Sequence, residues 1–174
     1  MAEFGLIQVY TGNGKGKTTA SLGLAFRACG HGFRVLMVQF MKECADYGEV
    51  KAAACLPGFK VIQVGRNDFV DLENPDPLDR QLAAAGWEKA KTFIDGGEYD
   101  IVILDEINVA MACGLLETAA VADFLIARRR PVEIILTGRY APGEIIAVAH
   151  LVTDMQDIKH PYAAGVEARQ GIDY

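Results

Sequence analysis

The feature that most constrains the fold is a glycine-rich segment that directly follows a short apolar run and directly precedes a helical pattern. The segment reads Thr11-Gly12-Asn13-Gly14-Lys15-Gly16-Lys17-Thr18-Thr19. Such a loop turns backbone N–H groups toward phosphates, and the helix that follows directs its positive end at the same anion. Lys17 is expected to reach the phosphate oxygens and the hydroxyl of Thr18 to ligate Mg²⁺. This strand, loop and helix context predicts a nucleoside triphosphate site.

The loop departs from the usual pattern of Gly, four residues and then Gly-Lys-Ser/Thr, because Thr11 stands at the first position. Lys15 also adds a second cation inside the loop. The same backbone donors can still hold phosphates, but the departure leaves open how the nucleotide lies and reacts. The alternative interpretation is a glycine-rich turn that binds no ligand.

Short apolar runs alternate with helical patterns along the whole chain. The runs cover residues 6–10, 34–40, 59–64, 100–104, 132–137 and, more weakly, 150–155, and the main helical patterns cover 18–29, 77–94 and 117–128. This alternation predicts an α/β fold with a mainly parallel sheet and helices on both faces. Residues 101–104 and 134–136 are nearly all apolar, so we expect them to form neighbouring central strands. We expect one P-loop domain spanning residues 1–174.

Two irregular segments, residues 41–48 and 65–76, each follow a predicted strand. Ligands of open α/β sheets bind outside the carboxyl ends of the strands, so these segments are predicted to form walls of a substrate site.

Composition narrows the class of partner. The content of 51% hydrophobic and 23% charged residues is typical of a globular domain, and the net charge of −6 argues against general binding to nucleic acid or an anionic membrane. No long apolar span or cleavable signal is visible, so a cytoplasmic location is expected. The cysteines are widely spaced and predict reduced, mostly buried thiols, and the scattered histidines are interpreted as structural. They are Cys29, Cys44, Cys55 and Cys113, and His31, His150 and His160.

A second nucleotide motif is the pair Asp105-Glu106 at the end of the apolar run 101–104. One carboxylate can hold Mg²⁺ directly or through water, and the other can orient or activate a reacting group. Arg139 follows the next buried run in Thr-Gly-Arg and is placed either to contact phosphate oxygens or to pair with one of the two carboxylates.

Several motifs together resemble the ATP:corrinoid adenosyltransferases, in the branch built on a RecA-like phosphate-loop fold. They are the loop at 11–19, Val-Gln-Phe at 38–40, Leu-Asp-Glu at 104–106, Thr-Gly-Arg at 137–139, Leu-Val-Thr-Asp-Met at 151–155 and the segment His-Pro-Tyr-Ala-Ala-Gly-Val-Glu-Ala-Arg-Gln-Gly-Ile-Asp-Tyr at 160–174. The resemblance spans nearly the whole chain and includes the unusual Thr11.

The resemblance implies transfer of the 5′-deoxyadenosyl group of ATP to the reduced Co(I) centre of a corrinoid, with triphosphate as the leaving group. ATP in this family is thought to lie reversed in the loop, which exposes C5′ instead of the γ-phosphorus. Co(I) is itself a strong nucleophile, so the protein's tasks are alignment and stabilisation of the departing charge. Lys15, Lys17 and Mg²⁺ suit those tasks. The family also suggests a homodimer.

Carried over residue by residue, the resemblance assigns ATP to the loop and to one helix residue, Arg27, which would contact the nucleoside end. Thr18 and Glu106 would serve Mg²⁺, while Lys17, Glu106 and Arg139 would act in catalysis. Phe69 would contact the corrinoid, although the Trp that some members carry two residues later is Asp71 here. The expected ATP-binding loop residues are Gly12, Asn13, Gly14, Lys15, Gly16, Lys17, Thr18 and Thr19.

Some members of the family also carry an N-terminal extension that covers the corrinoid, whereas few residues precede the first predicted strand here. Either another segment covers the corrinoid or the chain is a shortened form. Two rival functions remain open at this point. One is an ATP-hydrolysing or phosphoryl-transferring enzyme in which Glu106 positions water or an acceptor hydroxyl, and the other is a nucleotide-gated binding module without chemistry.

Overall fold

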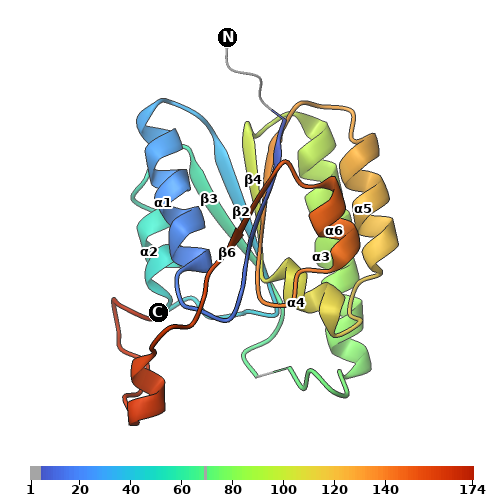
Figure 1. Ribbon diagram of the computed structural model, residues 1–174. Helices are drawn as coiled ribbons and strands as arrows, with labels where there is room; N and C mark the ends of the chain where they lie inside the picture. The colour runs from blue at the N-terminus through green and yellow to red at the C-terminus, as the bar shows by residue number, and fades with distance from the viewer. Residues whose placement is uncertain (1–4, 69) are drawn as a thin grey trace.

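The computed structural model describes residues 5–68 and 70–174. It contains a six-stranded sheet with the strand order β3-β2-β4-β5-β1-β6, and every neighbouring pair runs parallel (Figure 1). The strands are β1 (Ile7–Thr11), β2 (Val35–Phe40), β3 (Phe59–Val64), β4 (Ile101–Asp105), β5 (Glu133–Thr137) and β6 (Leu151–Asp154). All six predicted apolar runs therefore form strands, and the predicted parallel sheet is confirmed.

Helices cover both faces of the sheet, as predicted. In Figure 1, α1 and α2 lie on one side and the other four helices lie on the opposite side. The helices are α1 (Lys17–Gly30), α2 (Gly48–Ala53), α3 (Pro77–Gly96), α4 (Ile107–Ala112), α5 (Thr118–Ala127) and α6 (Gly143–Val148). The sequence did not predict α2, α4 and α6, because each has only 6 residues and too few turns to show a helical period.

The strands are buried on both faces, which explains their nearly continuous apolar composition. Along β2, Val35 and Met37 pack into the core beneath α1, while Leu36 and Val38 pack into the core beneath α3, α4 and α5. The two cores meet across β4 and β5, which pair with each other at the centre of the sheet. The prediction that residues 101–104 and 134–136 form neighbouring central strands is confirmed.

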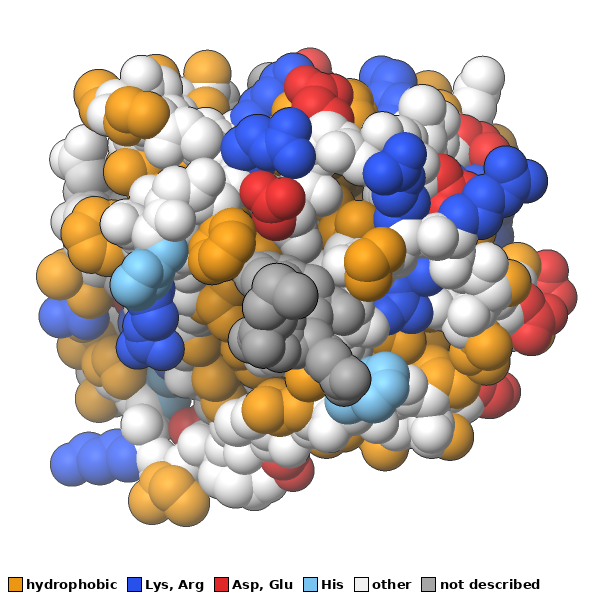
Figure 2. Space-filling view, turned by 90° about the horizontal axis from the view of Figure 1, so that it is seen from above, with side chains coloured by type: hydrophobic (Ala, Val, Ile, Leu, Met, Phe, Trp, Pro, Cys, Tyr) orange, Lys and Arg blue, Asp and Glu red, His pale blue; other side chains and the backbone are white. Residues whose placement is uncertain are grey.

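The strand order decides which segments meet at the site. β5 lies between β1, which leads into the glycine-rich loop, and β4, which ends at Asp105. The carboxyl ends of all the strands meet at one edge, the lower edge in Figure 1. Figure 2 shows the opposite end of the molecule, where acidic and basic side chains are mixed with apolar ones. Within the described parts of the chain, no helix has both the length and the apolar character needed to cross a bilayer.

The cysteines differ from the expectation. All four are free thiols, but Cys55 is exposed and the other three are half-buried, so the prediction of mostly buried thiols is wrong. Cys29 and Cys113 lie at the ends of helices, and Cys44 and Cys55 lie in loops. The spacing of cysteines along the sequence does not show these positions.

Candidate active site

The glycine-rich loop between β1 and α1 is packed tightly against the segment that follows β6. Gly12 and Gly16 have φ angles of 95° and 121°, which favour glycine. A Cβ atom at Gly12 would lie 2.7 Å from the backbone nitrogen of Met155 and would also overlap the Asp154 carboxylate. The amide of Gly14 donates to the Met155 carbonyl at 2.7 Å. The absence of side chains at Gly12 and Gly14 thus permits this close approach.

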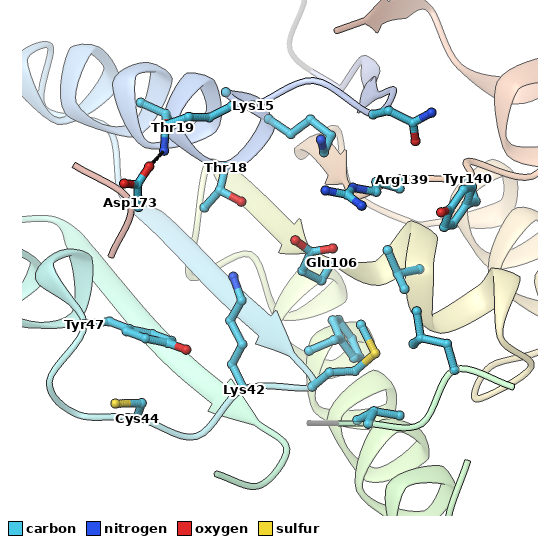
Figure 3. A pocket seen from close by; sticks show the side chains of 18 of the residues that line it. Lys15, Thr18, Thr19, Lys42, Cys44, Tyr47, Glu106, Arg139, Tyr140 and Asp173 are labelled. Carbon is cyan, nitrogen blue, oxygen red and sulfur yellow. Dashed lines mark hydrogen bonds and ion pairs between the residues drawn. The ribbon is translucent and has the colours of Figure 1, made fainter. Parts of the chain in front are cut away.

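The two loop lysines have different surroundings. The ammonium of Lys17 is buried and donates to the carbonyl of Gly14 at 2.6 Å, so it curls over the loop. Burial lowers the pKa of Lys17 and Arg139 lowers it further, while Glu106 and Asp154 act in the opposite direction. Lys15 points outward and forms an ion pair of 2.5 Å with Asp173 near the end of the chain (Figure 3).

Asp105 is the buried centre of the site, with an exposed fraction of 0%. Its Oδ1 accepts hydrogen bonds from the hydroxyls of Thr18 at 2.8 Å and Thr137 at 2.7 Å. Its Oδ2 accepts from the ammonium of Lys42 at 2.8 Å and from the amide of Gln39 at 3.2 Å. Burial alone would raise the pKa of Asp105, but the charge and hydrogen bond of Lys42 and the two hydroxyls lower it overall. The carboxylate is therefore ionised at neutral pH.

Glu106 points the other way, into the cavity, because its backbone turns left-handed at φ 62°. Its amide donates to the hydroxyl of Thr137 at 3.0 Å, which fixes the turn. Burial raises the pKa of Glu106 and the neighbouring Asp105 raises it further, against the influence of Lys42, Lys17 and Arg139. The adjacent carboxylates thus have different surroundings, since Asp105 binds neighbouring side chains of the protein and Glu106 faces the cavity.

Backbone strain is concentrated at this edge of the sheet. Among the described residues, the non-glycine positions with positive φ are Met41, Glu106 and Tyr140, with angles of 58°, 62° and 60°. All three follow the carboxyl ends of strands and line the same cavity. Strained non-glycine residues cluster at ligand sites, where the surrounding structure holds them in place.

The cavity has a volume of about 640 Å³, within the range of small-molecule sites. Arg139 projects into it near Glu106 and the loop (Figure 3). No ion pair joins Arg139 to Asp105 or Glu106 in the part of the chain that the structure describes. The walls of the cavity come from the glycine-rich loop, from both predicted irregular segments and from the C-terminal tail. The loop residues that line it are Asn13, Gly14, Lys15, Gly16, Lys17, Thr18 and Thr19.

Two of the expected site residues, Gly12 and Arg27, do not line the main cavity, and the position of a third is not described. Gly12 lines an adjacent cavity with Asp154. Arg27 is exposed in the last turn of α1 and is not among the residues that line the main cavity. Phe69, the expected corrinoid contact, lies outside the described residues, although its neighbours Asp68 and Val70 line the cavity.

The structure adds residues that sequence reasoning missed. Lys42 follows β2 and lies opposite Asp105, and the register explains why, since Gln39 of β2 pairs with Asp105 of β4. The available signal was that Lys42 is the cation of the irregular segment 41–48. Asp173 lies in segment 160–174, which resembles the family, but nothing in its local sequence connects it with Lys15.

The donor set can be compared with the needs of Mg²⁺. Among the described residues, no group of three His, Cys, Asp or Glu side chains could hold a metal ion by itself. Thr18 donates its proton to Asp105, which leaves the oxygen lone pairs of the hydroxyl free to face the cavity. With the carboxylate of Glu106, this gives oxygen ligands that suit a magnesium ion completed by nucleotide oxygens and water.

Comparison with known proteins agrees with this geometry. The family model described as ATP:corrinoid adenosyltransferase BtuR/CobO/CobP matches residues 3–174. A corrinoid adenosyltransferase from Sinorhizobium sp. is 38% identical over 99% of this chain and 81% of its own length. One from Escherichia coli is also 38% identical, over 99% of this chain and 87% of its own length.

A solved structure, the flagellar accessory protein FlaH from Methanocaldococcus jannaschii, is similar with a TM-score of 0.61 at 15% identity, over 87% of this chain and 71% of that chain. At this identity the likeness shows the fold alone, an α/β fold, which agrees with the predicted class. The matches over nearly the whole chain confirm the family that the sequence motifs indicated, and the chain belongs to the ATP:corrinoid adenosyltransferase family.

Proposed function

We propose that this chain transfers the 5′-deoxyadenosyl group of ATP to the Co(I) centre of a corrinoid substrate, in the synthesis or salvage of adenosylcobalamin. Cobalt donates an electron pair to C5′, a cobalt–carbon bond forms, and the bond between C5′ and its oxygen breaks. The triphosphate leaves with the electron pair of the broken bond. Cobalt is formally oxidised from Co(I) to Co(III), so no further oxidant is needed.

The observation that carries the proposal is the set of charges around one cavity at the phosphate loop. Lys17, Arg139 and the outward-facing Lys15 surround the space next to the loop amides. A leaving triphosphate carries several negative charges, and prearranged cations and N–H groups stabilise such charge best in a site that excludes water. Lys17 and Arg139 are therefore assigned to the triphosphate, and Arg27 is proposed to contact the nucleoside end.

Magnesium fits the donors that face the cavity. Thr18 and Glu106 would hold it, with Asp105 orienting the Thr18 hydroxyl. Bound Mg²⁺ would supply a positive charge next to the departing triphosphate. The strained turn at Glu106 keeps its carboxylate in the cavity, and Lys42 keeps Asp105 ionised so that the hydroxyl of Thr18 continues to donate to it.

The corrinoid is proposed to enter from the side formed by residues 65–76, with Phe69 against it. Arg66 helps to anchor this segment, since its guanidinium pairs with the buried Asp79 of α3 at 2.9 Å. We further propose that one domain carries the whole reaction, that the enzyme is cytoplasmic and that it acts as a homodimer, as its family resemblance suggests.

The test is an anaerobic incubation with ATP, Mg²⁺ and a chemically reduced corrinoid, followed by the visible spectrum. The proposal expects an ATP-dependent alkyl-corrinoid spectrum that light reverses. Glu106→Gln removes the proposed metal ligand and should slow its appearance strongly, whereas Glu88→Gln, on the exposed side of α3, should not. Absence of the light-sensitive product with a folded, ATP-binding protein would contradict the assignment.

A further inference from the structure

The C-terminal tail runs from β6 past the phosphate loop and ends beside α2 (Figure 1). Near its end, Asp173 reaches the loop. Its Oδ1 lies 2.5 Å from the ammonium of Lys15, and the carbonyl of Ile172 accepts a second hydrogen bond from the same ammonium at 3.0 Å. The pair is drawn as the dashed line in Figure 3. Residues 158 positions apart in sequence thus meet at the mouth of the site.

Asp173 is held from its other side by the tail itself. Its Oδ2 accepts from the amide of Arg169 at 2.9 Å and from the guanidinium of Arg169 at 3.2 Å. The amide of Asp173 donates to the carbonyl of Arg169 at 2.8 Å, which closes a compact turn. The hydrogen bonds from Lys15 and from the Arg169 amide hold the pKa of Asp173 well below its usual range. The carboxylate is ionised and both of its oxygens are occupied.

Lys15, Asp173 and Arg169 together carry two positive charges and one negative charge. The three side chains together are therefore net positive, even though one of them is a carboxylate. The ammonium of Lys15 has three donors, and Asp173 and Ile172 use two of them. Among the described residues no third acceptor is recorded for this ammonium, which leaves one N–H for a phosphate oxygen.

The tail also forms part of the walls. Lys15 and Asp173 line the main cavity. A further cavity of about 540 Å³ shares Thr18 and Glu106 with the main cavity, and its lining includes Gly171, Ile172, Asp173 and Tyr174. The last residue lies against the start of α2, where a Cβ at Gly48 would be 3.8 Å from the Tyr174 carbonyl carbon. The tail thus spans from the phosphate loop to α2.

We propose that Asp173 is a positioning residue for Lys15, through which the docked C-terminal tail and bound ATP stabilise each other. The inference rests on the proposed function of the loop in binding ATP. A free lysine side chain on a loop loses considerable rotamer freedom when it binds phosphate. Asp173 and Ile172 restrict Lys15 before ATP arrives, so less freedom is lost on binding.

The first test is the dissociation constant of ATP with Mg²⁺, measured by calorimetry without any corrinoid, for the wild type and Asp173→Asn. The change keeps the size of the side chain and removes its charge. We expect ATP to bind about two- to fivefold more weakly, as befits an exposed ion pair. Asp123→Asn, on the exposed surface of α5, is the matched control and should bind as the wild type does. Equal or tighter binding by Asp173→Asn would overturn the proposal.

The second test asks whether the effect passes through Lys15. In a Lys15→Met background, adding Asp173→Asn should leave the dissociation constant of ATP unchanged. A further loss equal to that seen in the wild-type background would show that Asp173 acts by another route, and would overturn the positioning role.

The third measurement follows the tail directly. Trypsin can cut after Arg169, and mass spectrometry reports the loss of residues 170–174. Saturating ATP should slow this cleavage in the wild type, and Asp173→Asn should speed it without a change in melting temperature. An equal cleavage rate with and without ATP would overturn the proposed coupling between the tail and bound ATP. None of these assays requires adenosyl transfer, so failure of the tail proposal and failure of the proposed reaction are distinguishable.

Discussion

Replacing Lys42 with Met tests the electrostatic centre of the site. Asp105 is fully buried and accepts four hydrogen bonds from described residues, of which the one from Lys42 is charged. Removing one partner of a buried pair leaves a charge without compensation, which typically costs about 3–5 kcal/mol. Three neutral donors remain here, so we expect the lower end, about 3 kcal/mol.

The loss should appear as a fall in melting temperature of roughly 6–12 °C for a chain of this size. Lys51→Met is the matched control, because Lys51 pairs with Asp46 at 3.0 Å while their side chains are 56% and 90% exposed. Breaking that surface pair should cost under about 1 kcal/mol. The double variant Lys42→Met with Asp105→Asn should recover much of the loss, since no ionised carboxylate stays buried.

The sign of the pH dependence follows from the lowered pKa of Asp105 in the wild type. Its ionised form stabilises the fold above the unfolded pKa, about 3.9, and this stabilisation is lost as pH falls through the lower folded pKa. Without Lys42, burial raises the pKa of Asp105, so protonation in acid removes the uncompensated buried charge. The stability gap between Lys42→Met and the wild type should narrow from about pH 7 to about pH 5. A loss no larger than that of Lys51→Met, or a gap that widens in acid, would refute the reasoning.

Three further predictions concern the loop and the ligands. Lys17→Ala removes the buried cation of the loop. The fall in kcat/KM, measured by steady-state kinetics, should correspond to a loss of about 2–4 kcal/mol in transition-state stabilisation. Near-normal kinetics would contradict its role. Phe69→Ala should raise KM for the corrinoid with unchanged ATP affinity, whereas a loss of about 3–5 kcal/mol in unfolding free energy would mean that the ring is core packing. Gly12→Ala places a Cβ against Asp154 at a φ of 95°, so both ATP affinity and melting temperature should fall, and a stable, tight-binding variant would contradict this packing.

Local patterns predicted the fold and much of the site. Each strand carries its own apolar run, and the loop beginning at Thr11 carries its own glycines and lysines, so both can be recognised from neighbouring residues alone. The Asp105-Glu106 pair was recognised in the same way. The local residues did not show which carboxylate faces the cavity, because this depends on the left-handed turn at Glu106; only the family resemblance assigned Glu106 to Mg²⁺.

The remaining features are long-range. Thr137 meets Asp105 only because β5 lies between β1 and β4, and Lys42 meets it only because of the register between β2 and β4. The contact between Lys15 and Asp173 depends on the path of the whole tail. Strand order, register and tail path arise from packing of the complete chain, which spacing within one segment does not encode.

In the proposed reaction ATP is attacked at C5′ and not at the γ-phosphorus, and the identity of the leaving group distinguishes the two. Phosphorus NMR of an anaerobic reaction with ATP, Mg²⁺ and a reduced corrinoid would identify the phosphate products directly. Attack at C5′ predicts triphosphate in amounts equal to the light-sensitive cobalt–carbon product, and none without corrinoid. Formation of ADP and inorganic phosphate at the same rate with and without corrinoid would contradict it and would favour hydrolysis with Glu106 positioning water.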